Sequence, residues 1–308
     1  LHAKQVMEST QFQEQHSQTG QVMGVHKVNV PIEILFEGSD INVYNDKYNP
    51  DVELERQFSA IPEDSNFLFV GHWLEGEIGQ DRKDVGMLIK TFLTVFKNNP
   101  NAPGLILKTS RATFSVIDRI DLLNRITAIK NGMKGKLPNI YLLHGDLSPD
   151  QMNSLYNHPK VKTMISFTKG EGYGRPLQEF MFTGKPIIAS NWSGHIDFLE
   201  NYAELVGGAL TDVHQSAINK FLIKGAKWFT INYNEAAQIM ATIHADYKKV
   251  YNKTKKVAAS KRNKFSLDEM HIKFEKLLND TVKVVAKKEL VLPELKLPKL
   301  RVPVRVVE

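Results

Sequence analysis

Short apolar runs alternate with longer amphipathic stretches from residue 66 onward. The runs are rich in β-branched residues, which is typical of strands buried on both faces of a parallel sheet. The expected strands are 67–70, 105–108, 140–143, 163–167 and 186–189, with 205–210 less clearly marked.

The amphipathic stretches between these runs predict helices. In the clearest one, 85–97, apolar residues recur at helical spacing: Val85, Leu88, Ile89, Phe92, Val95 and Phe96. Further helices are expected at 117–130, 149–156, 176–183 and 235–251. Ser266 and Glu269 form a capping box that opens a last helix to about residue 285. The alternation predicts an α/β fold, a Rossmann-like parallel sheet with helices on both faces.

The two ends of the chain lack this alternation. Residues 1–24 are polar, rich in Gln and weakly helical, and 28–35 is predicted to be a strand. Residues 45–65 are polar and contain two prolines, so a linker is expected there. Prolines recur every five residues in 289–308, which excludes a helix and favours an extended tail.

Composition places few further limits on the protein. The 308 residues are 42% hydrophobic and 24% charged, which is ordinary for a globular protein. No apolar run approaches the roughly 18 residues of a membrane helix, and the first residues do not resemble a signal peptide. The chain has no cysteine, which excludes disulfides and cysteine sites and fits a cytoplasmic location.

Positive charge is concentrated near the C-terminus. Residues 245–308 contain 17 Lys and Arg against 8 Asp and Glu, a balance of +9, so the rest of the chain is at −3 within the net +6. A solvated helix face is one explanation. The other is contact with an anionic lipid or nucleic acid.

The richest chemistry lies between two carboxylates that are eight positions apart, Glu171 and Glu179. Glu171 follows a predicted strand, and Glu179 lies inside a helix that Pro176 can open. Gly172 and Gly174 allow a tight turn between them. Free amides at a helix start bind anions, and carboxylates bind hydroxyls. The segment therefore suits a ligand that carries a diphosphate and several hydroxyls, although a plain surface turn has the same outline.

This segment, continued by Gly-Lys-Pro-Ile-Ile-Ala-Ser190 and Ser193-Gly194, resembles the Glu-x7-Glu signature of retaining glycosyltransferases of the GT-B fold, family-4 or group 1 type. The resemblance implies that Glu171 lies beside the donor sugar and that Glu179 binds the ribose. It implies donor contacts from the turn itself, formed by Gly172, Tyr173, Gly174, Arg175 and Leu177.

The same resemblance points to residues at other strand ends, where ligands of open α/β sheets bind. Lys83, after Arg82, matches the lysine that binds the donor diphosphate, and it is expected to be catalytic together with Glu171. His72 stands where the family has an arginine, and a neutral histidine offers one hydrogen bond rather than a charged fork. Gly145 and Lys108 are expected near the nucleotide.

Trp192 and His195 are further candidates, expected to line the sugar pocket. Packing explains Trp192 equally well.

The resemblance covers 66–210 well and 1–45 and 211–285 loosely, so it accounts for a donor half without an acceptor half. We expect a remnant of, or crossover from, an N-terminal domain with a linker at 1–60. A nucleotide-sugar-binding domain at 61–250, C-terminal helices at 251–288 and the tail at 289–308 follow. Because the resemblance accounts only for the donor half, the acceptor domain is expected to be absent or to lie in residues that this chain does not contain.

The implied activity is transfer of a sugar, expected to be a hexose as from UDP-glucose, to an acceptor hydroxyl with retained configuration. No Asp-x-Asp occurs in the chain, which fits a metal-independent enzyme without a cofactor. The alternative is a catalytically incomplete module that binds sugar nucleotides or has a structural role.

The acceptor stays open between a saccharide or glycan and a hydroxymethylated base in DNA. Segments at 70–74, 81–85 and 106–110 resemble glycosyltransferases of large bacteriophages and marine viruses, which motivates the DNA acceptor and a host-cytoplasmic location. The nucleotide base, the sugar, the linkage and the oligomeric state are not defined by the sequence.

Overall fold

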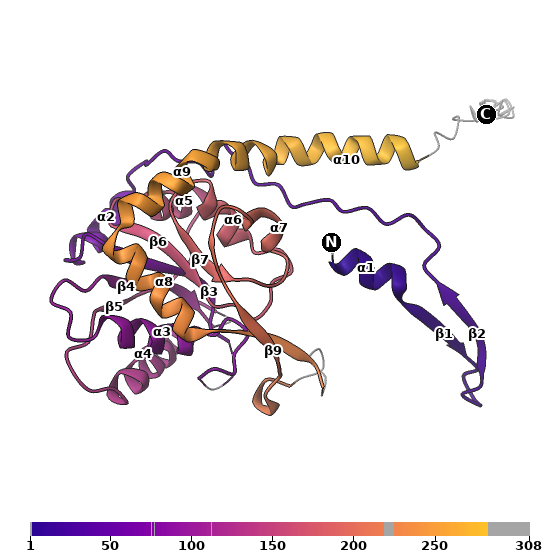
Figure 1. Ribbon diagram of the computed structural model, residues 1–308, viewed down its shortest axis with the longest axis horizontal. Helices are drawn as coiled ribbons and strands as arrows, with labels where there is room; N and C mark the ends of the chain where they lie inside the picture. Colours follow the sequence, from indigo (N-terminus) through magenta and orange to yellow (C-terminus); the bar gives the residue numbers. More distant parts are fainter. Residues whose placement is uncertain (1, 75, 77, 112, 219–224, 283–308) are drawn as a thin grey trace, which may run out of the picture.

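The computed structural model describes residues 2–282, except for 75, 77, 112 and 219–224. An α/β body carries an N-terminal arm to one side and a helix, α10, that projects along its top (Figure 1). None of the helices in these described ranges is long and apolar enough to cross a membrane. The tail predicted at 289–308 lies outside the described residues.

A six-stranded parallel sheet forms the centre of the body, in the order β5-β4-β3-β6-β7-β8. Its strands are β3 Asn66–His72, β4 Gly104–Ser110, β5 Ile140–Leu143, β6 Val161–Ser166, β7 Ile187–Ser190 and β8 Glu204–Val206. The chain builds outward from β3 to β5 and then returns to start again beside β3 with β6. The sheet therefore has a topological switch point between β3 and β6, where Rossmann-like folds bind their ligands.

Helices cover both faces of the sheet. One face packs against α3 Val85–Phe96, α4 Val116–Asn131 and α8 Tyr233–Ala245. The other packs against α2 Val52–Ser59, α5 Pro149–Asn157, α6 Arg175–Met181, α7 Ile196–Leu199 and α9 Tyr247–Lys264.

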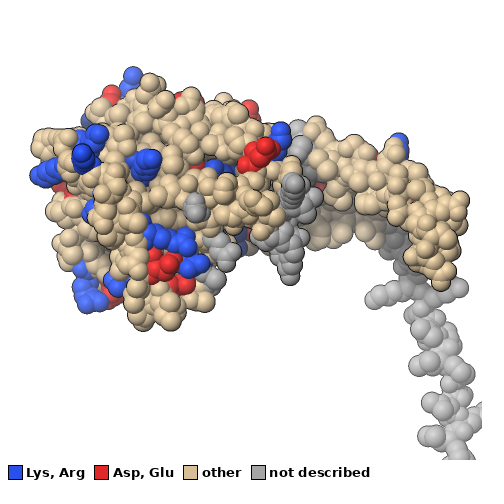
Figure 2. Space-filling model, turned by 90° about the horizontal axis from the view of Figure 1, so that it is seen from below, with Lys and Arg blue, Asp and Glu red and all other residues tan. Residues whose placement is uncertain are grey.

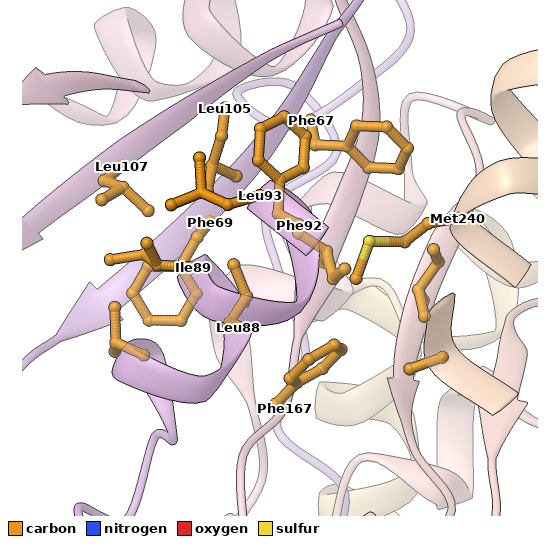
Figure 3. Packing of buried hydrophobic residues seen from close by; sticks show 14 of the residues in the cluster. Phe67, Phe69, Leu88, Ile89, Phe92, Leu93, Leu105, Leu107, Phe167 and Met240 are labelled. Atoms are coloured by element: carbon orange, nitrogen blue, oxygen red, sulfur yellow. The ribbon is translucent and has the colours of Figure 1, made fainter. Parts of the chain in front are cut away.

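Alternate strand residues fill the two cores, because successive side chains of a strand point to opposite faces. Phe67 and Phe69 of β3 pack with α3 (Figure 3), whereas Leu68 faces the opposite core. On β4, Leu105 and Leu107 likewise lie in the core that contains α3, whereas Ile106 between them faces the opposite core. The predicted fold class and its five clear strands are confirmed.

Two predicted elements are each divided in the structure. The helix expected at 235–251 breaks at Asp246, which ends α8 and whose side chain accepts a hydrogen bond from the Lys249 amide to start α9. The strand expected at 205–210 becomes β8 and the separate β9 Gly208–Asp212. β9 leaves the sheet to pair with β10 Lys227–Ile231, a strand that was not predicted from the sequence.

The segment 45–65, predicted to be a linker, contains helix α2 Val52–Ser59, which was not predicted. Asp51 caps helix α2 by accepting a hydrogen bond from the Leu54 amide. Leu54 and Phe58, four positions apart, bury one face of this helix in the core. A single short amphipathic stripe among polar residues was too weak a signal to recognise.

The arm contains α1 His2–Ser9 and a hairpin of β1 Gln11–Gln15 with β2 Val22–Lys27. Residues 28–35, predicted to be a strand, are instead an extended strap without a partner strand among the described residues. Ser39 then bridges to Ser266, which caps α10 Leu267–Thr281. The predicted end of this last helix near 285 lies outside the described residues.

Candidate active site

The loops at the switch point bring Glu171 to the two cations expected to bind a diphosphate. The Lys83 ammonium donates a hydrogen bond to Glu171 Oε1. Arg82 Nη1 lies 3.3 Å from Glu171 Oε2 and donates to the Gly170 carbonyl at 2.6 Å. The loops after β3 and β6 thus meet at the carboxyl edge of the sheet, where Glu171 and Lys83 are nearly buried.

The environment keeps Glu171 ionised. Burial opposes its charge most strongly, but the attraction of Lys83 and Arg82 outweighs burial and holds the pKa of the carboxyl below its usual range. For Lys83, burial is the stronger influence and lowers the pKa of the ammonium, although Glu171 opposes this. The result is a desolvated, paired carboxylate and cation, an arrangement common at functional sites.

A buried clamp holds these loops together. Asp84, in a left-handed conformation with φ 54°, lies 3.4 Å from the Lys169 ammonium and accepts a 2.5 Å hydrogen bond from the Tyr233 hydroxyl. The Lys169 amide donates to the Arg82 carbonyl at 2.8 Å. The sequence showed Asp84 only as a helix-start residue and gave no signal for Lys169 or Tyr233, because their meeting depends on the tertiary fold.

Glu179, the second carboxylate, lies in a different setting inside α6. The Tyr156 hydroxyl donates to its Oε2 at 3.0 Å, and Arg175 Nε lies 3.6 Å from its Oε1. Burial raises the pKa of the Glu179 carboxyl above its usual range, because Tyr156 and Arg175 offset burial only in part. Arg175 is more than half exposed, whereas the Glu179 side chain is nearly buried. The sequence gave no signal for Tyr156.

The glycine turn is bound to the loop that follows β7. Ser193 Oγ donates to the Glu171 carbonyl at 2.6 Å and accepts from the Glu171 amide at 3.0 Å. Gly194 approaches so closely that a Cβ there would lie 2.1 Å from the Gly172 carbonyl. Gly174 starts α6 at φ 99°, a conformation that favours glycine. Four backbone and side-chain features therefore fix the position of Glu171.

Two residues of the motif, Tyr173 and Leu177, have side chains that pack against the core. Leu177 is buried in the core, and its amide donates to the Gly174 carbonyl. The Tyr173 ring packs against Phe198, and its hydroxyl accepts a hydrogen bond from the Gln178 amide group. Any contact of the buried Leu177 with a sugar nucleotide would therefore come from its backbone.

His195 is fully buried, and burial lowers the pKa of its imidazole. Its Nε2 lies 2.7 Å from the Ser190 carbonyl, which can only accept, so Nε2 carries the proton of the neutral ring. The candidate Trp192 is half-buried and stacks on Phe229, with ring centroids 5.7 Å apart.

The predicted nucleotide residues also meet. Lys108 donates a 2.6 Å hydrogen bond to the Gly145 carbonyl and lies over the half-exposed Phe114 ring. The His144 ring contacts Phe114 edge-on. His72 is exposed, and its Nδ1 lies 3.0 Å from Ser110 Oγ, so its side chain hydrogen-bonds to β4. Among the described residues, no three His, Asp or Glu side chains gather as metal ligands.

No family model and no curated protein matches this chain. Solved structures do match. A glycosyltransferase from Rickettsia africae ESF-5 is 15% identical over 81% of this chain and 57% of its own, with a TM-score of 0.56. Alr3699/HepE from Anabaena, solved in complex with UDP-glucose, is 17% identical over 80% and 57%, with a TM-score of 0.55.

A third similar structure is a UDP-forming α,α-trehalose-phosphate synthase from Burkholderia vietnamiensis. It is 11% identical over 79% of this chain and 50% of its own, with a TM-score of 0.57. The fold is thus that of a GT-B glycosyltransferase domain, as predicted. The chain spans little more than half the length of these structures.

Proposed function

We propose that this chain binds a nucleotide-diphosphate sugar and provides the donor side of a retaining glycosyltransferase. The observation that carries the proposal is the contact of Glu171 with Lys83 and Arg82 at the switch point of the sheet. A buried carboxylate held between two cations, with a second carboxylate eight residues later, matches a ligand with separate anionic and hydroxyl-rich parts.

The cations act on the leaving group. A donor diphosphate entering the crevice offers Lys83 and Arg82 a stronger anionic partner than a single carboxylate. Charge on the diphosphate grows as the sugar leaves, so cations already in place in a desolvated site stabilise the transition state more than the ground state. Glu171, released in part from them, turns its oxygens to the sugar hydroxyls and favours positive charge on the ring.

The bond changes follow from retention. The bond between the anomeric carbon and the diphosphate oxygen breaks with both electrons going to that oxygen. An acceptor hydroxyl attacks the same face, and its proton passes to the departing phosphate. Glu179 then has the binding role, since its Oε1 edge can accept hydrogen bonds from ribose hydroxyls while Tyr156 holds Oε2.

The proposed donor contacts reach beyond the two carboxylates. Lys108 and Gly145 border the nucleotide, with the Phe114 ring beside them. The proposal includes a hexosyl donor such as UDP-glucose, independence of metal ions and no cofactor.

A donor-binding module without turnover is the second candidate. It is favoured by the half-length match and by His72, which pairs with Ser110 where the family has an arginine. The two candidates differ in one observable, because a module binds the donor but does not hydrolyse or transfer it.

The test is the melting temperature of the purified chain with a panel of nucleotide diphosphates and nucleotide sugars, without metal. Ligand at about 100 times its Kd should stabilise the fold by roughly 2.7 kcal/mol. We expect a melting shift with ligands of one base. Lys83→Ala should diminish this shift, whereas Lys90→Ala, at an exposed lysine of helix α3 that follows the Lys83 loop, should leave it intact. No shift with any donor would refute the proposal, and a shift without donor hydrolysis would favour the module.

A further inference from the structure

A large cavity separates the arm from the candidate active site. Its volume is about 740 Å³, inside the range of about 300–1,000 Å³ typical of small-molecule sites. One wall comes from α1 and the strap, with Lys4, Met7 and Ile32. The other comes from Glu171 and the loop that includes Trp192. Figure 1 shows α1 beside α7, which agrees with this lining.

The cavity opens onto the reacting part of the proposed site. Glu171 and Gly172 line it directly, and the Ser193 that holds Glu171 lines it too. An acceptor must approach the donor sugar from a side that the diphosphate does not occupy. Because Lys83 and Arg82 hold Glu171 from the diphosphate side, the cavity lies where a second substrate would meet the sugar.

The strap is built to form a wall. Its even-numbered residues Ile32 and Ile34 are half-buried, whereas Glu33 between them is exposed, as expected of an extended segment with one face toward the body. Lys4 of α1 lies 3.6 Å from Glu33, so an ion pair joins α1 to the strap. The arm therefore presents aliphatic groups and one carboxylate to the cavity.

The charges of the lining select against a polyanion. Its ionisable members are three carboxylates, Glu33, Glu171 and Asp197, against a single lysine, Lys4, which already lies near Glu33 and Glu8. Nucleic acid is bound through several Lys and Arg side chains that neutralise phosphates, whereas this lining offers Lys4 alone. On the face shown in Figure 2, the described Lys and Arg stand in separate groups rather than in one continuous strip.

We propose that this cavity is the acceptor site and takes an uncharged saccharide, with the N-terminal arm as its outer wall. The inference rests on the proposed function. Carboxylates accept hydrogen bonds from sugar hydroxyls, while Met7, Ile32 and the half-buried Trp192 ring contact the apolar faces of a sugar ring. Of the two acceptors left open by the sequence, the structure favours the saccharide over a base in DNA.

The test compares two neighbouring positions of α1. Met7 lines the cavity, whereas Val6 is exposed and does not line it, so Met7→Trp fills the site and Val6→Trp is the matched control. Binding of neutral mono- and disaccharides is measured by saturation-transfer NMR, beside the donor-induced melting shift. We expect Met7→Trp to weaken saccharide binding at least about tenfold and Val6→Trp less than about twofold, with the donor shift unchanged in both.

The outcomes separate the two proposals. A donor shift without saccharide binding, or saccharide binding that Met7→Trp leaves intact, overturns the acceptor site. Tighter binding of a hydroxymethylated DNA duplex, lost in Met7→Trp, also overturns it. Saccharide binding lost in Met7→Trp, in a protein that shows no donor shift, leaves a sugar site standing while the proposed transferase function fails.

Discussion

The loop after β6 and helix α6 each contain a glutamate of the motif, eight positions apart, but the two segments shift the pKa of that carboxyl in opposite directions. Cations surround Glu171, and the pKa of its carboxyl is lowered despite burial. Glu179 has a tyrosine hydroxyl and a more distant arginine, and burial raises the pKa of its carboxyl. The two carboxylates of the motif therefore lie in opposite electrostatic environments, and this difference agrees with the separate roles proposed for them.

The largest expected effect comes from removing the clamp on the Glu171 loop. Lys169→Met leaves Asp84 buried without its cation, which should lower the free energy of unfolding by about 3–5 kcal/mol. Chemical denaturation measures this loss. The double variant Asp84→Asn with Lys169→Met should recover most of it, since no uncompensated charge remains. An equal loss in the double variant would show that shape rather than charge pairing matters.

Lys83→Ala should lower donor turnover about 10²–10³-fold, because a preorganised group that stabilises developing charge is lost. Initial rates of donor hydrolysis or transfer measure this, with Lys90→Ala on the following helix α3 as the control. A fall confined to KM would contradict the assignment, because it would place the role of Lys83 in the ground state.

Asp81 tests the same electrostatic argument through pH. It lies in the loop that contacts Glu171, but the pKa of its carboxyl is raised, as that of Glu179 is. Burial, aided by nearby Asp84, raises the pKa of Asp81 to about 6 from an unfolded value near 4. Between about pH 4 and 6 the unfolded chain releases this proton first, so the fold loses stability as pH rises, by about 3 kcal/mol in total. Asp81→Asn should abolish this loss. Denaturation curves at pH 4 and 7 give the change in the free energy of unfolding, and the same change in the variant as in the wild type would disprove the role of Asp81.

The smallest expected effect is a difference in sign between the two glutamates. At pH 7 the lowered pKa of Glu171 contributes stability that is lost as pH falls, so Glu171→Gln should lower the melting temperature. The raised pKa of Glu179 means that its ionisation costs stability as pH rises, so Glu179→Gln should raise it. Each kcal/mol shifts the melting temperature by about 2–4 °C. Shifts of the same sign in both variants would show that the environments are not opposite.

The sheet could be predicted because its strands are buried on both faces and their apolar runs need no partner to be recognised. Lys83 was expected at the same site as Glu171 because of the family resemblance, and the rule that strand ends share one edge placed Lys108 and Gly145 at that edge. Tyr156 and Lys169 could not be found, since a buried polar side chain reveals its partner only after folding. The Lys185 ammonium donates three hydrogen bonds to carbonyls between the end of α5 and the start of β6, those of Tyr156, His158 and Val161. Lys185 of the Gly-Lys-Pro segment therefore supports the fold rather than the ligand.

The arm was the least predictable region. The residues of its hairpin are almost all exposed, so the sequence there lacks the apolar alternation of a strand that packs on a core. The strand of this region is β2, which pairs with β1 and ends at Lys27, just before the strand expected at 28–35. The wall that the arm forms around the cavity becomes visible only when the strap and the Glu171 loop are placed together.

The central claim is tested most directly by calorimetric titration of UDP and UDP-glucose into the wild type, Glu171→Gln and Glu179→Gln. If the melting panel selects another nucleotide base, the matching diphosphate and its sugar replace this pair. The account predicts that Glu179→Gln weakens both ligands equally, by about tenfold or 1.4 kcal/mol, because both contain the ribose. Glu171→Gln should weaken only the sugar-bearing ligand relative to its diphosphate. Equal losses for both ligands in both variants would contradict the division of roles between the two carboxylates.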